Sequence, residues 1–393
     1  MKILVVCQFY YPENFTITKI AEHLASVGHD VTVLTGKPNY GYGYILPEYK
    51  NVKFEVINGV KVHRVNLIPR KKSRLSIIHN YLSFWSNSKK WIRNCKEKYD
   101  VVYSMSLSPV TILSAGNLYK KLHKVPHVVH CVDLWPESTL ITHAVKKDSI
   151  FYKILYKWSK KLYLGADKIL IGSPSFKEYF QNVLNIKTDH ITFVPQPSLI
   201  ESSDIEPYNF GDGFNVLYCG NLGIIQLINL IPETMKHLKE TNIKFHVIGM
   251  GPKTDELLSL IKEYSLEDKV IYHGPIPAKK AVSYFKGADA LYISLKSEGY
   301  VGKTLPNKLM MSMAFGKPII GVLGGDGKAA ILEANGGYIS SEDPREIAKT
   351  IENMSKLDAE TRNKLGSNNQ VYYQNNYSQS RVGELVDLAL KEF

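Results

Sequence analysis

SEGYVGKTLPNKLMMSMAFGKP, residues 297–318, places an acidic residue, a Pro-Asn-Lys corner and a small-residue helix in one stretch. The run before it, ALYISL at 290–295, is short, apolar and rich in β-formers, which predicts a buried strand ending just before Glu298. Ligands of open α/β sheets bind at the carboxyl ends of the strands. Pro306 suits the first turn of a helix, so the free N–H groups of residues 307–309 and the charge of Lys308 would face an anion. The stretch therefore predicts a corner that grips a nucleotide sugar.

Apolar, strand-like runs alternate with helical patterns on both sides of this corner. Strands are predicted at 3–7, 30–34, 62–65, 101–105, 127–132, 168–171 and 191–194, and again at 215–219, 244–248, 270–273, 290–295 and 318–322. Helices are expected near 18–27, over 227–239 and over the last residues, 378–393. This alternation is typical of doubly wound parallel sheets and places the chain in the α/β class.

The domain border is predicted from two prolines and a polar segment. Pro195 and Pro197 end the first alternation, and residues 198–212 are rich in Ser, Asp, Glu and Pro without periodicity. We therefore expect a first domain over 1–197, a linker over 198–212, a second domain over 213–375 and a final helical segment over 376–393.

Composition is that of a globular protein of two domains. The 393 residues are 44% hydrophobic and 22% charged, and a single core rarely grows to this length. We find no apolar run long enough for a membrane span, and the first apolar run is too short for a signal peptide. The four cysteines show no paired spacing, so we expect neither disulfides nor a zinc cluster, and a cytoplasmic location.

Positive charge is concentrated in the first half. Residues 1–195 hold 28 Lys/Arg against 13 Asp/Glu, whereas the rest hold 21 against 24. Within residues 68–98, and again within 146–168, basic residues are interleaved with aliphatic and aromatic ones, which favours helices lying on an anionic membrane surface. A core helix with a solvated basic face is the alternative, and nucleic acid is not expected. The basic residues that we assign to the membrane are Arg70, Lys71, Lys72, Arg74, Lys89 and Lys90.

Six motifs follow one another along the chain: PEN at 12–14, LTGKPNYGYG at 34–43, NYLSF at 80–84, DLWPES at 133–138, GNLG at 220–223 and LPNKL at 305–309. In this order they resemble the retaining family-4 glycosyltransferases of the GT-B fold, in particular the bacterial branch that builds capsule, colanic acid and O-antigen and includes N-acetyl-L-fucosaminyl transferases. The resemblance covers nearly the whole chain. It implies two facing Rossmann-like domains, with the last helix crossing back onto the amino-terminal domain.

The resemblance also implies an activity. Such an enzyme would move a sugar, here an N-acetylated or 6-deoxy N-acetylated hexose, from a UDP-sugar to a polyprenyl-diphosphate-linked saccharide, with retention and without a metal or other cofactor. It would work at the inner face of the cell membrane, and domain closure would bring donor and acceptor together. Two alternatives stay open: a UDP-sugar epimerase, which would need no acceptor, and a non-catalytic membrane-associated assembly partner. The sequence leaves the sugar, linkage, acceptor and oligomeric state open.

The donor is expected in the carboxy-terminal domain. Glu298 matches the first Glu of the family's Glu-x7-Glu signature, which contacts the transferred sugar, whereas Met311 replaces the second, which commonly binds the ribose. Small residues after the strand at 215–219 allow a phosphate to approach the backbone. Gln226 stands near the place where many relatives carry Arg and Lys, so the phosphate charge would rest on Lys303 and Lys308. The predicted donor-binding residues are Gly220, Asn221, Gly223, Gln226, Gly249, Lys303, Pro306, Asn307 and Lys308, with Glu298 catalytic.

The acceptor is expected at the amino-terminal domain. Asp133 follows a predicted strand, where a carboxylate can orient or deprotonate a hydroxyl. Val132 occupies the place of the usual His, and His130 is considered a partial substitute; Glu137 is a further catalytic candidate, or else a helix-start residue. Bulky residues at Glu13 and Asn14, where many relatives have glycines, and Ser106 are expected to line the acceptor cleft, although serines there could equally cap a helix.

Overall fold

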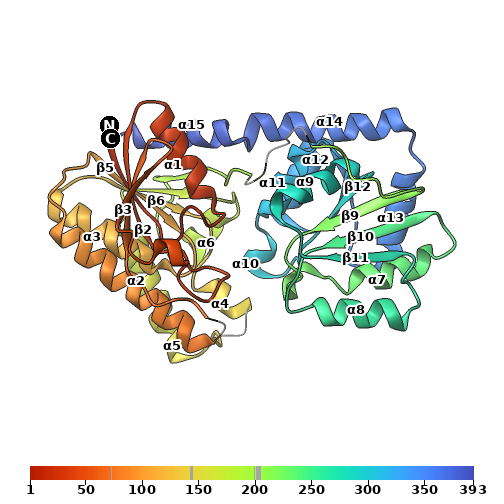
Figure 1. Ribbon diagram of the computed structural model, residues 1–393, viewed down its shortest axis with the longest axis horizontal. Helices are drawn as coiled ribbons and strands as arrows, with labels where there is room; N and C mark the ends of the chain where they lie inside the picture. Colours follow the sequence, from red (N-terminus) through yellow and green to blue (C-terminus); the bar gives the residue numbers. More distant parts are fainter. Residues whose placement is uncertain (72, 142–144, 199, 201–204) are drawn as a thin grey trace. The chain divides into compact units, whose positions relative to one another are not determined.

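The computed structural model describes residues 1–71, 73–141, 145–198, 200 and 205–393. The chain forms two compact units: Met1–Leu199 together with Gln379–Phe393, and Ile200–Ser378. Each unit holds one sheet that consists mainly of parallel strands with helices packed against it (Figure 1). The predicted α/β class with two Rossmann-like domains is therefore confirmed.

The sheet of the first unit has eight strands in the order β3-β4-β2-β1-β5-β6-β7-β8. Only β3 runs antiparallel, paired with β4, and its residues are only partly buried, so the alternation of the buried strands did not reveal it. The central strands are buried on both faces and consequently read as continuous apolar runs. The strand bounds are β1 Lys2–Val6, β2 Asp30–Gly36, β3 Phe54–Ile57, β4 Val60–Val65, β5 Val101–Ser106, β6 His127–Cys131, β7 Lys168–Ile171 and β8 Ile191–Phe193.

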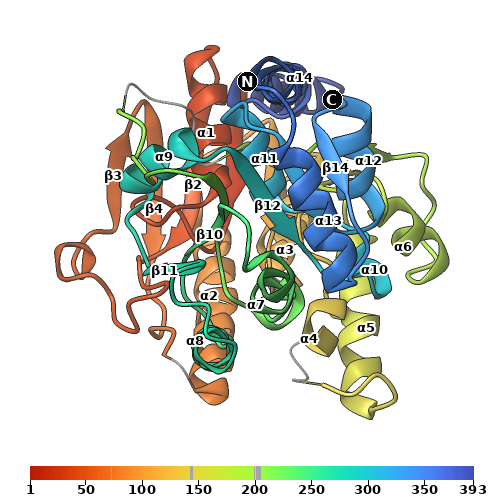
Figure 2. The same ribbon diagram turned by 90° about the vertical axis from the view of Figure 1, so that its right-hand side faces the viewer.

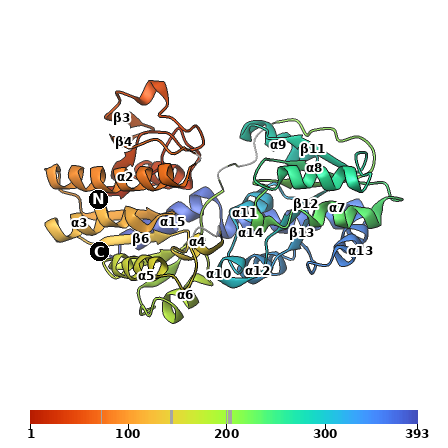
Figure 3. The ribbon, with the colours of Figure 1, turned by 90° about the horizontal axis from the view of Figure 1, so that it is seen from below.

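Alternate residues of β1 enter two different cores. Ile3 and Val5 pack with helices α1 (Thr16–Ser26) and α15 (Gln379–Leu390), whereas Leu4 and Val6 pack with residues of α2 (Arg74–Asn94) and α3 (Leu113–His123). Figure 3 shows α2, α3 and α5 (Ile150–Tyr163) lying side by side over this second face. Two short helices, α4 (Glu137–Ile141) and α6 (Phe176–Asn182), follow β6 and β7.

The last helix belongs to the first unit, as expected. In α15, Val382 and Val386 are fully buried in the core that contains α1, and Asp387 Oδ1 lies 2.7 Å from His29 Nε2. The preceding helix, α14 (Ala359–Asn376), packs instead on α11 (Asn307–Ala314) and α12 (Gly325–Ala334) of the second unit. The chain thus returns to its first unit immediately after Ser378.

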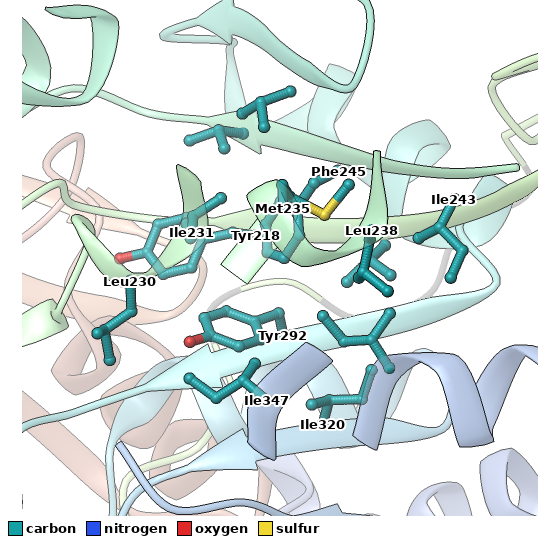
Figure 4. Packing of buried hydrophobic residues seen from close by; sticks show 14 of the residues in the cluster. Tyr218, Leu230, Ile231, Met235, Leu238, Ile243, Phe245, Tyr292, Ile320 and Ile347 are labelled. Carbon is teal, nitrogen blue, oxygen red and sulfur yellow. The ribbon is translucent and has the colours of Figure 1, made fainter. Parts of the chain in front are cut away.

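The second unit has a six-stranded parallel sheet in the order β11-β10-β9-β12-β13-β14. Figure 2 shows β11, β10, β12 and β14 in this order across the sheet. On one face, residues such as Tyr218, Met235, Phe245 and Tyr292 form a continuous core (Figure 4). The strands are β9 Phe214–Cys219, β10 Ile243–Ile248, β11 Val270–Gly274, β12 Ala290–Ser294, β13 Ile319–Val322 and β14 Gly337–Ile339. The helices are α7 Leu230–Met235, α8 Thr254–Glu263, α9 Ala278–Gly287, α10 Gly299–Gly302, α11 Asn307–Ala314, α12 Gly325–Ala334 and α13 Pro344–Ser355.

Two predictions of local structure need correction. The helix expected over 227–239 is divided into α7 and a 3-10 turn, and Leu227 itself has a left-handed backbone, with φ of 50°. Of the expected linker, residues 199 and 201–204 lie outside the described residues. Its later part is packed on the second unit, because Tyr208 donates its N–H to Ser283 O and its ring stacks on Tyr284 at 4.0 Å.

Candidate active site

Two glycine loops lie against each other at the carboxyl edge of the second sheet. Gly220 and Gly249 follow the neighbouring strands β9 and β10, and the Gly220 N–H donates to Ile248 O at 3.0 Å. Gly249 has φ of 135°, and a Cβ at this position would lie 1.8 Å from Gly220 O. Only glycine therefore permits this contact. A Cβ on Gly251 would likewise lie only 2.4 Å from Leu222 O, so the two loops form one tight backbone surface.

Lys308 places a cation beside these loops. Its Nζ lies 2.7 Å from Tyr218 Oη and 4.4 Å from the centre of the Tyr218 ring, and a Cβ on Gly220 would be 3.3 Å from it. Burial lowers the pKa of Lys308 to about 8, although part of the side chain reaches solvent. Among the residues that the structure describes, no carboxylate forms an ion pair with Lys308. A cation fixed in this way without an acidic partner suits an anionic ligand.

Tyr218 is a functional candidate that sequence reasoning missed. Besides contacting Lys308, its hydroxyl donates to Asn221 O at 2.7 Å, which holds the first glycine loop. The signal in the sequence is weak, because a tyrosine in an apolar strand is ordinarily a core residue.

The start of α11 differs from the prediction. Pro306 is the N-cap rather than the first helical residue, and the Leu309 N–H donates to Pro306 O at 2.9 Å. That amide is therefore not available to an anion, contrary to expectation. Asn307, the first helical residue, is exposed at this end of the helix. Lys303 is exposed, with its Nζ 5.6 Å from the Tyr300 ring centre.

Glu298 stands at the same edge of the sheet, after β12. It is the N-cap of α10, its side chain is 79% exposed, and Oε2 lies 3.0 Å from Lys296 Nζ. This carboxylate is accessible to a ligand, because such an exposed pair costs little to open. Gln226 lies near Gly223, and its buried Oε1 has no hydrogen-bond partner among the described residues. Met311 packs against the apolar core that includes α11, so it offers no hydroxyl acceptor for a ribose.

Asp133 occupies the corresponding edge of the first sheet, after β6. Its Oδ2 accepts a hydrogen bond from Ser108 Oγ at 3.3 Å, and Ser108 Oγ lies 2.9 Å from Ser138 Oγ. Loss of hydration among the surrounding residues raises the pKa of the Asp133 carboxyl above its usual range, although the residue is exposed. A reachable carboxylate with a raised pKa can act as a general base.

His130 lies in the core of the first unit. It is 0% exposed, its Nδ1 lies 2.8 Å from Tyr103 Oη, and its Nε2 lies 2.8 Å from Val194 O. Burial lowers the pKa of His130 to about 4. The predicted catalytic role is contradicted, because both nitrogens are engaged and no substrate reaches the ring.

The other predicted acceptor residues have mixed positions. Ser106 is fully buried within β5, so Ser108, two residues further, is the serine that reaches the site. Glu13 is 7% exposed and its Oε1 accepts the N–H groups of Asn39 and Tyr40, so it braces a loop instead of lining a cleft. Asn14 is exposed.

Glu137 begins α4 and has a specific partner. Its Oε1 accepts a short hydrogen bond from the Tyr152 hydroxyl of α5. This contact joins two helices of the first unit, so the structure favours the structural role at a helix start over catalysis.

The residues assigned to a membrane surface also divide. Lys71, Arg74 and Lys90 are exposed, and Lys89 Nζ lies 4.4 Å from the Trp85 ring centre. Lys72 lies outside the described residues. Arg70 is not a free surface cation, since its guanidinium carbon lies 5.1 Å from the Tyr40 ring centre and 5.5 Å from that of Tyr81.

Helices α2 and α5 carry exposed apolar side chains beside these basic residues. The exposed set on α2 is Leu75, Ile78 and Leu82, and that on α5 is Ile150, Phe151 and Ile154. Trp85 of α2 meets Trp158 of α5 edge to face at 6.1 Å. Beside this contact lies an open groove of about 930 Å³ with five lysines in its lining: Lys89, Lys120, Lys121, Lys124 and Lys161. Among the described helices, none is both long and apolar enough to span a membrane.

Comparisons with known proteins identify both units. Residues 14–197 match the model of the glycosyl transferase 4-like domain, and residues 203–371 match that of glycosyl transferases group 1. The probable glycosyltransferase WbjE of Pseudomonas aeruginosa is 25% identical over 295 residues, which are 71% of either chain. The amylovoran biosynthesis glycosyltransferase AmsD of Erwinia amylovora is 22% identical over 68% of this chain and 69% of that one. A putative colanic acid biosynthesis glycosyltransferase of Escherichia coli, WcaL, is 29% identical over 33% of this chain and 32% of its own.

Solved structures of the same fold cover the whole chain. Sucrose-phosphate synthase from Thermosynechococcus elongatus superimposes with a TM-score of 0.74 at 16% identity, over 100% of this chain and 98% of that one. Anabaena HepE in complex with UDP gives a TM-score of 0.71 at 14% identity, over 100% of both chains.

Proposed function

Because the chain consists of a glycosyl transferase 4-like domain followed by a glycosyl transferases group 1 domain, we propose that it is a retaining glycosyltransferase of surface-polysaccharide assembly. It moves a sugar, an N-acetylated or 6-deoxy N-acetylated hexose, from a UDP-sugar to a polyprenyl-diphosphate-linked saccharide. Relatives named for colanic acid and amylovoran biosynthesis support the pathway class. HepE, a protein of the same fold solved with UDP, supports the nucleotide.

The observation that carries the proposal is Lys308 beside the glycine loops. When the sugar leaves, negative charge grows on the diphosphate, and a preorganised cation stabilises that charge. Lys308 is fixed by Tyr218 and has no described carboxylate partner. An anion beside it raises its pKa from about 8, which keeps the ammonium protonated at neutral pH. In this proposal the protein's own cations and amides neutralise the leaving group, with no step through a metal ion.

The two carboxylates have separate roles in the proposed reaction. Glu298, exposed at the edge of the second sheet, positions the donor sugar. Asp133, with Ser108 as its hydrogen-bond donor, orients the acceptor hydroxyl and can accept its proton. The departing phosphate is a second possible acceptor for that proton.

In this proposal the first unit binds an anionic membrane through one surface, which we define as the exposed apolar residues of α2 and α5 with Lys71, Arg74, Lys89 and Lys90. An apolar stripe beside lysines and tryptophans is typical of helices that lie in an anionic headgroup layer. A lipid-linked acceptor would place the enzyme at the inner face of the membrane. Neutralising Lys71 and Arg74 should weaken sedimentation with anionic vesicles, and Leu75→Ser with Ile78→Ser should weaken it further. If both double variants bound vesicles as well as the wild type does, the membrane-binding role of this surface would be refuted.

The decisive experiment is acceptor-dependent UDP release. UDP-sugars are screened with lipid-diphosphate-linked monosaccharides, and the wild type is compared with Glu298→Gln, Asp133→Asn and a control, Glu352→Gln, in an exposed ion pair elsewhere in the second unit. We expect the first two variants to lose at least tenfold in turnover while remaining folded, and the control to retain activity. Full turnover in both Glu298→Gln and Asp133→Asn would refute the proposed site.

The second candidate function is a non-catalytic assembly partner. It is favoured because His130 is buried in the core and Met311 packs against an apolar cluster, so neither side chain can take a catalytic or ribose-binding role. It predicts vesicle binding with no UDP release from any substrate pair. Release of an altered UDP-sugar without acceptor would instead indicate an epimerase.

A further inference from the structure

Three of the sequence motifs meet in one buried polar network in the first unit. Gln8, Glu13, Asn39 and Asn80 are all 7% exposed or less. The Gln8 side chain donates to Asn80 Oδ1 at 2.7 Å, Asn80 Nδ2 lies 3.1 Å from Asn39 Oδ1, and the Asn39 N–H donates to Glu13 Oε1 at 2.6 Å. Glu13, Asn39 and Asn80 come from the PEN, LTGKPNYGYG and NYLSF motifs, and Gln8 lies two residues after β1. Hydrogen bonds between buried side chains hold the segments that carry them rigidly together.

The segment that the network fixes is 68–70. Asn80 Nδ2 donates to Ile68 O at 2.6 Å, the Ile68 N–H donates to Ser83 Oγ at 2.9 Å, and the Arg70 N–H donates to Asn39 Oδ1 at 2.9 Å. The backbone that carries Arg70 is therefore held at three points, two of them by the network residues Asn39 and Asn80 and the third by Ser83.

Two tyrosines then hold the Arg70 side chain. Its Nη1 donates to Tyr81 Oη at 3.0 Å, and the guanidinium lies near the faces of Tyr81 and Tyr40 at 5.5 Å and 5.1 Å. Tyr40 itself is packed edge-on against Phe9 at 5.0 Å and Phe15 at 5.2 Å. The cation is thus preorganised, and a ligand that binds it avoids much of the entropy of ordering an arginine.

The charge of Arg70 has no acidic partner among the residues that the structure describes. Arg64, by contrast, is buried and paired with Glu55. A guanidinium has five N–H donors in a planar fork, and for Arg70 one side-chain hydrogen bond, to Tyr81, is present. Arg70 is only partly buried, so donors of the fork can reach a ligand.

Arg70 also lies in the neighbourhood of the acceptor carboxylate. Burial raises the pKa of Tyr81, the positive charge of Arg70 lowers it, and the negative charge of Asp133 raises it more weakly. The topology agrees, because Arg70 follows β4 and Asp133 follows β6, and these two strands run in the same direction in the first sheet, so both segments leave it at its carboxyl edge.

We propose that Arg70, framed by Tyr40 and Tyr81, is an anion-binding subsite for a phosphate or carboxylate group of the acceptor. The inference rests on the proposed function, because it assumes that the acceptor binds the first unit. A phosphate would come from the diphosphate of a lipid carrier, whereas a carboxylate would come from an acidic sugar. Either group accepts two parallel N–H bonds from a guanidinium.

The test uses the full chain saturated with UDP, so that added anions cannot occupy the site at Lys308. Inorganic pyrophosphate and glucuronate are titrated in separate arms by isothermal calorimetry. Variants are Arg70→Ala, Arg70→Lys and Tyr81→Phe, with Arg93→Ala as the matched control, because Arg93 is an exposed arginine in the last turn of the same helix that carries Tyr81. Thermal unfolding and UDP binding of each variant check that it is folded.

We expect saturable binding of one probe, which identifies the source of the anion. Arg70→Ala should weaken that binding at least tenfold, Arg70→Lys and Tyr81→Phe should have intermediate effects, and Arg93→Ala should stay within about twofold. Equal losses of probe affinity in Arg70→Ala and Arg93→Ala would show that only the net charge of the protein matters, which would overturn the inference. It would also be overturned if neither probe bound saturably to the wild type. If wild type bound no UDP at all, the proposed function would fail instead.

Discussion

Replacing Gly249 by alanine tests whether the two glycine loops form the donor site. The added Cβ would lie 1.8 Å from Gly220 O, a backbone atom that cannot move aside as a flexible side chain can. Overpacking of this kind costs ~1–3 kcal/mol. The backbone at φ 135° is strained for any residue with a Cβ, which costs a further ~1–3 kcal/mol. We therefore expect about 4 kcal/mol of lost stability in the second unit.

The matched control is Gly274→Ala at the end of the neighbouring strand β11. Gly274 also has a positive φ, 73°, but no atom lies within 4 Å of the added Cβ. Its cost should be backbone strain alone, about 1–2 kcal/mol. For a domain of this size, about 2–4 °C of Tm corresponds to each kcal/mol. Calorimetry should thus show a fall of roughly 8–16 °C for Gly249→Ala and roughly 2–8 °C for the control.

Binding of UDP completes the test. Gly249→Ala should weaken UDP binding at least tenfold in the folded protein, because the loops must separate to admit the methyl group, whereas Gly274→Ala should leave it within about threefold. Equal effects of the two substitutions on stability and on UDP binding would refute the reasoning, since the steric contact would then contribute nothing.

Two further predictions concern titrating groups. Burial lowers the pKa of Lys308 to about 8, so the affinity for UDP, measured by calorimetry, should fall as the pH rises from 7 to 9. Lys308→Arg should abolish this pH dependence. Lys308→Met should bind UDP at least tenfold more weakly than wild type at pH 7. Burial lowers the pKa of His130 to about 4 and that of His127 to about 3. The unfolded chain binds these protons near pH 6.5, whereas the folded chain binds them only at lower pH. The free energy of unfolding should therefore decrease as the pH falls from about 6.5 to about 4, and each histidine should contribute up to about 1.4 kcal/mol of this decrease per pH unit. Urea unfolding of His130→Gln between pH 7 and 5 should show a shallower loss than wild type, and an equally steep one would contradict the assignment.

Much of the fold was predictable because buried parallel strands are distinctive. The strand at 168–171 was predicted to the residue, and the others, apart from β3 and β14, to within about two residues at either end. Strand β3 and the short strand β14 were not predicted, because strands at the edge of a sheet are partly exposed and lack a clear apolar pattern. The helix at 227–239 was overextended, since a left-handed residue inside a stretch of apolar residues leaves no clear mark in the pattern.

The candidate site was predictable in its positions and less so in its side chains. Gly220, Gly249, Lys308, Glu298 and Asp133 all fall at the carboxyl ends of strands or at a helix start, where the spacing indicated them. His130 and Glu13 were misjudged because a polar residue near a strand end can point either into the core or toward the edge. Only the tertiary contacts distinguish the two.

The sequence by itself determined the two α/β units, the order of their elements and the edge at which each site lies, because these follow from local periodicity and from the geometry of parallel sheets. The tertiary structure alone decided which charged side chains are paired within the protein and which are available to a ligand. Arg64 and Arg70 are alike in sequence, yet one pairs with Glu55 and the other is held between tyrosines without a described acidic partner. The physical reason is that pairing, burial and preorganisation depend on residues far apart in the chain, which no local pattern encodes.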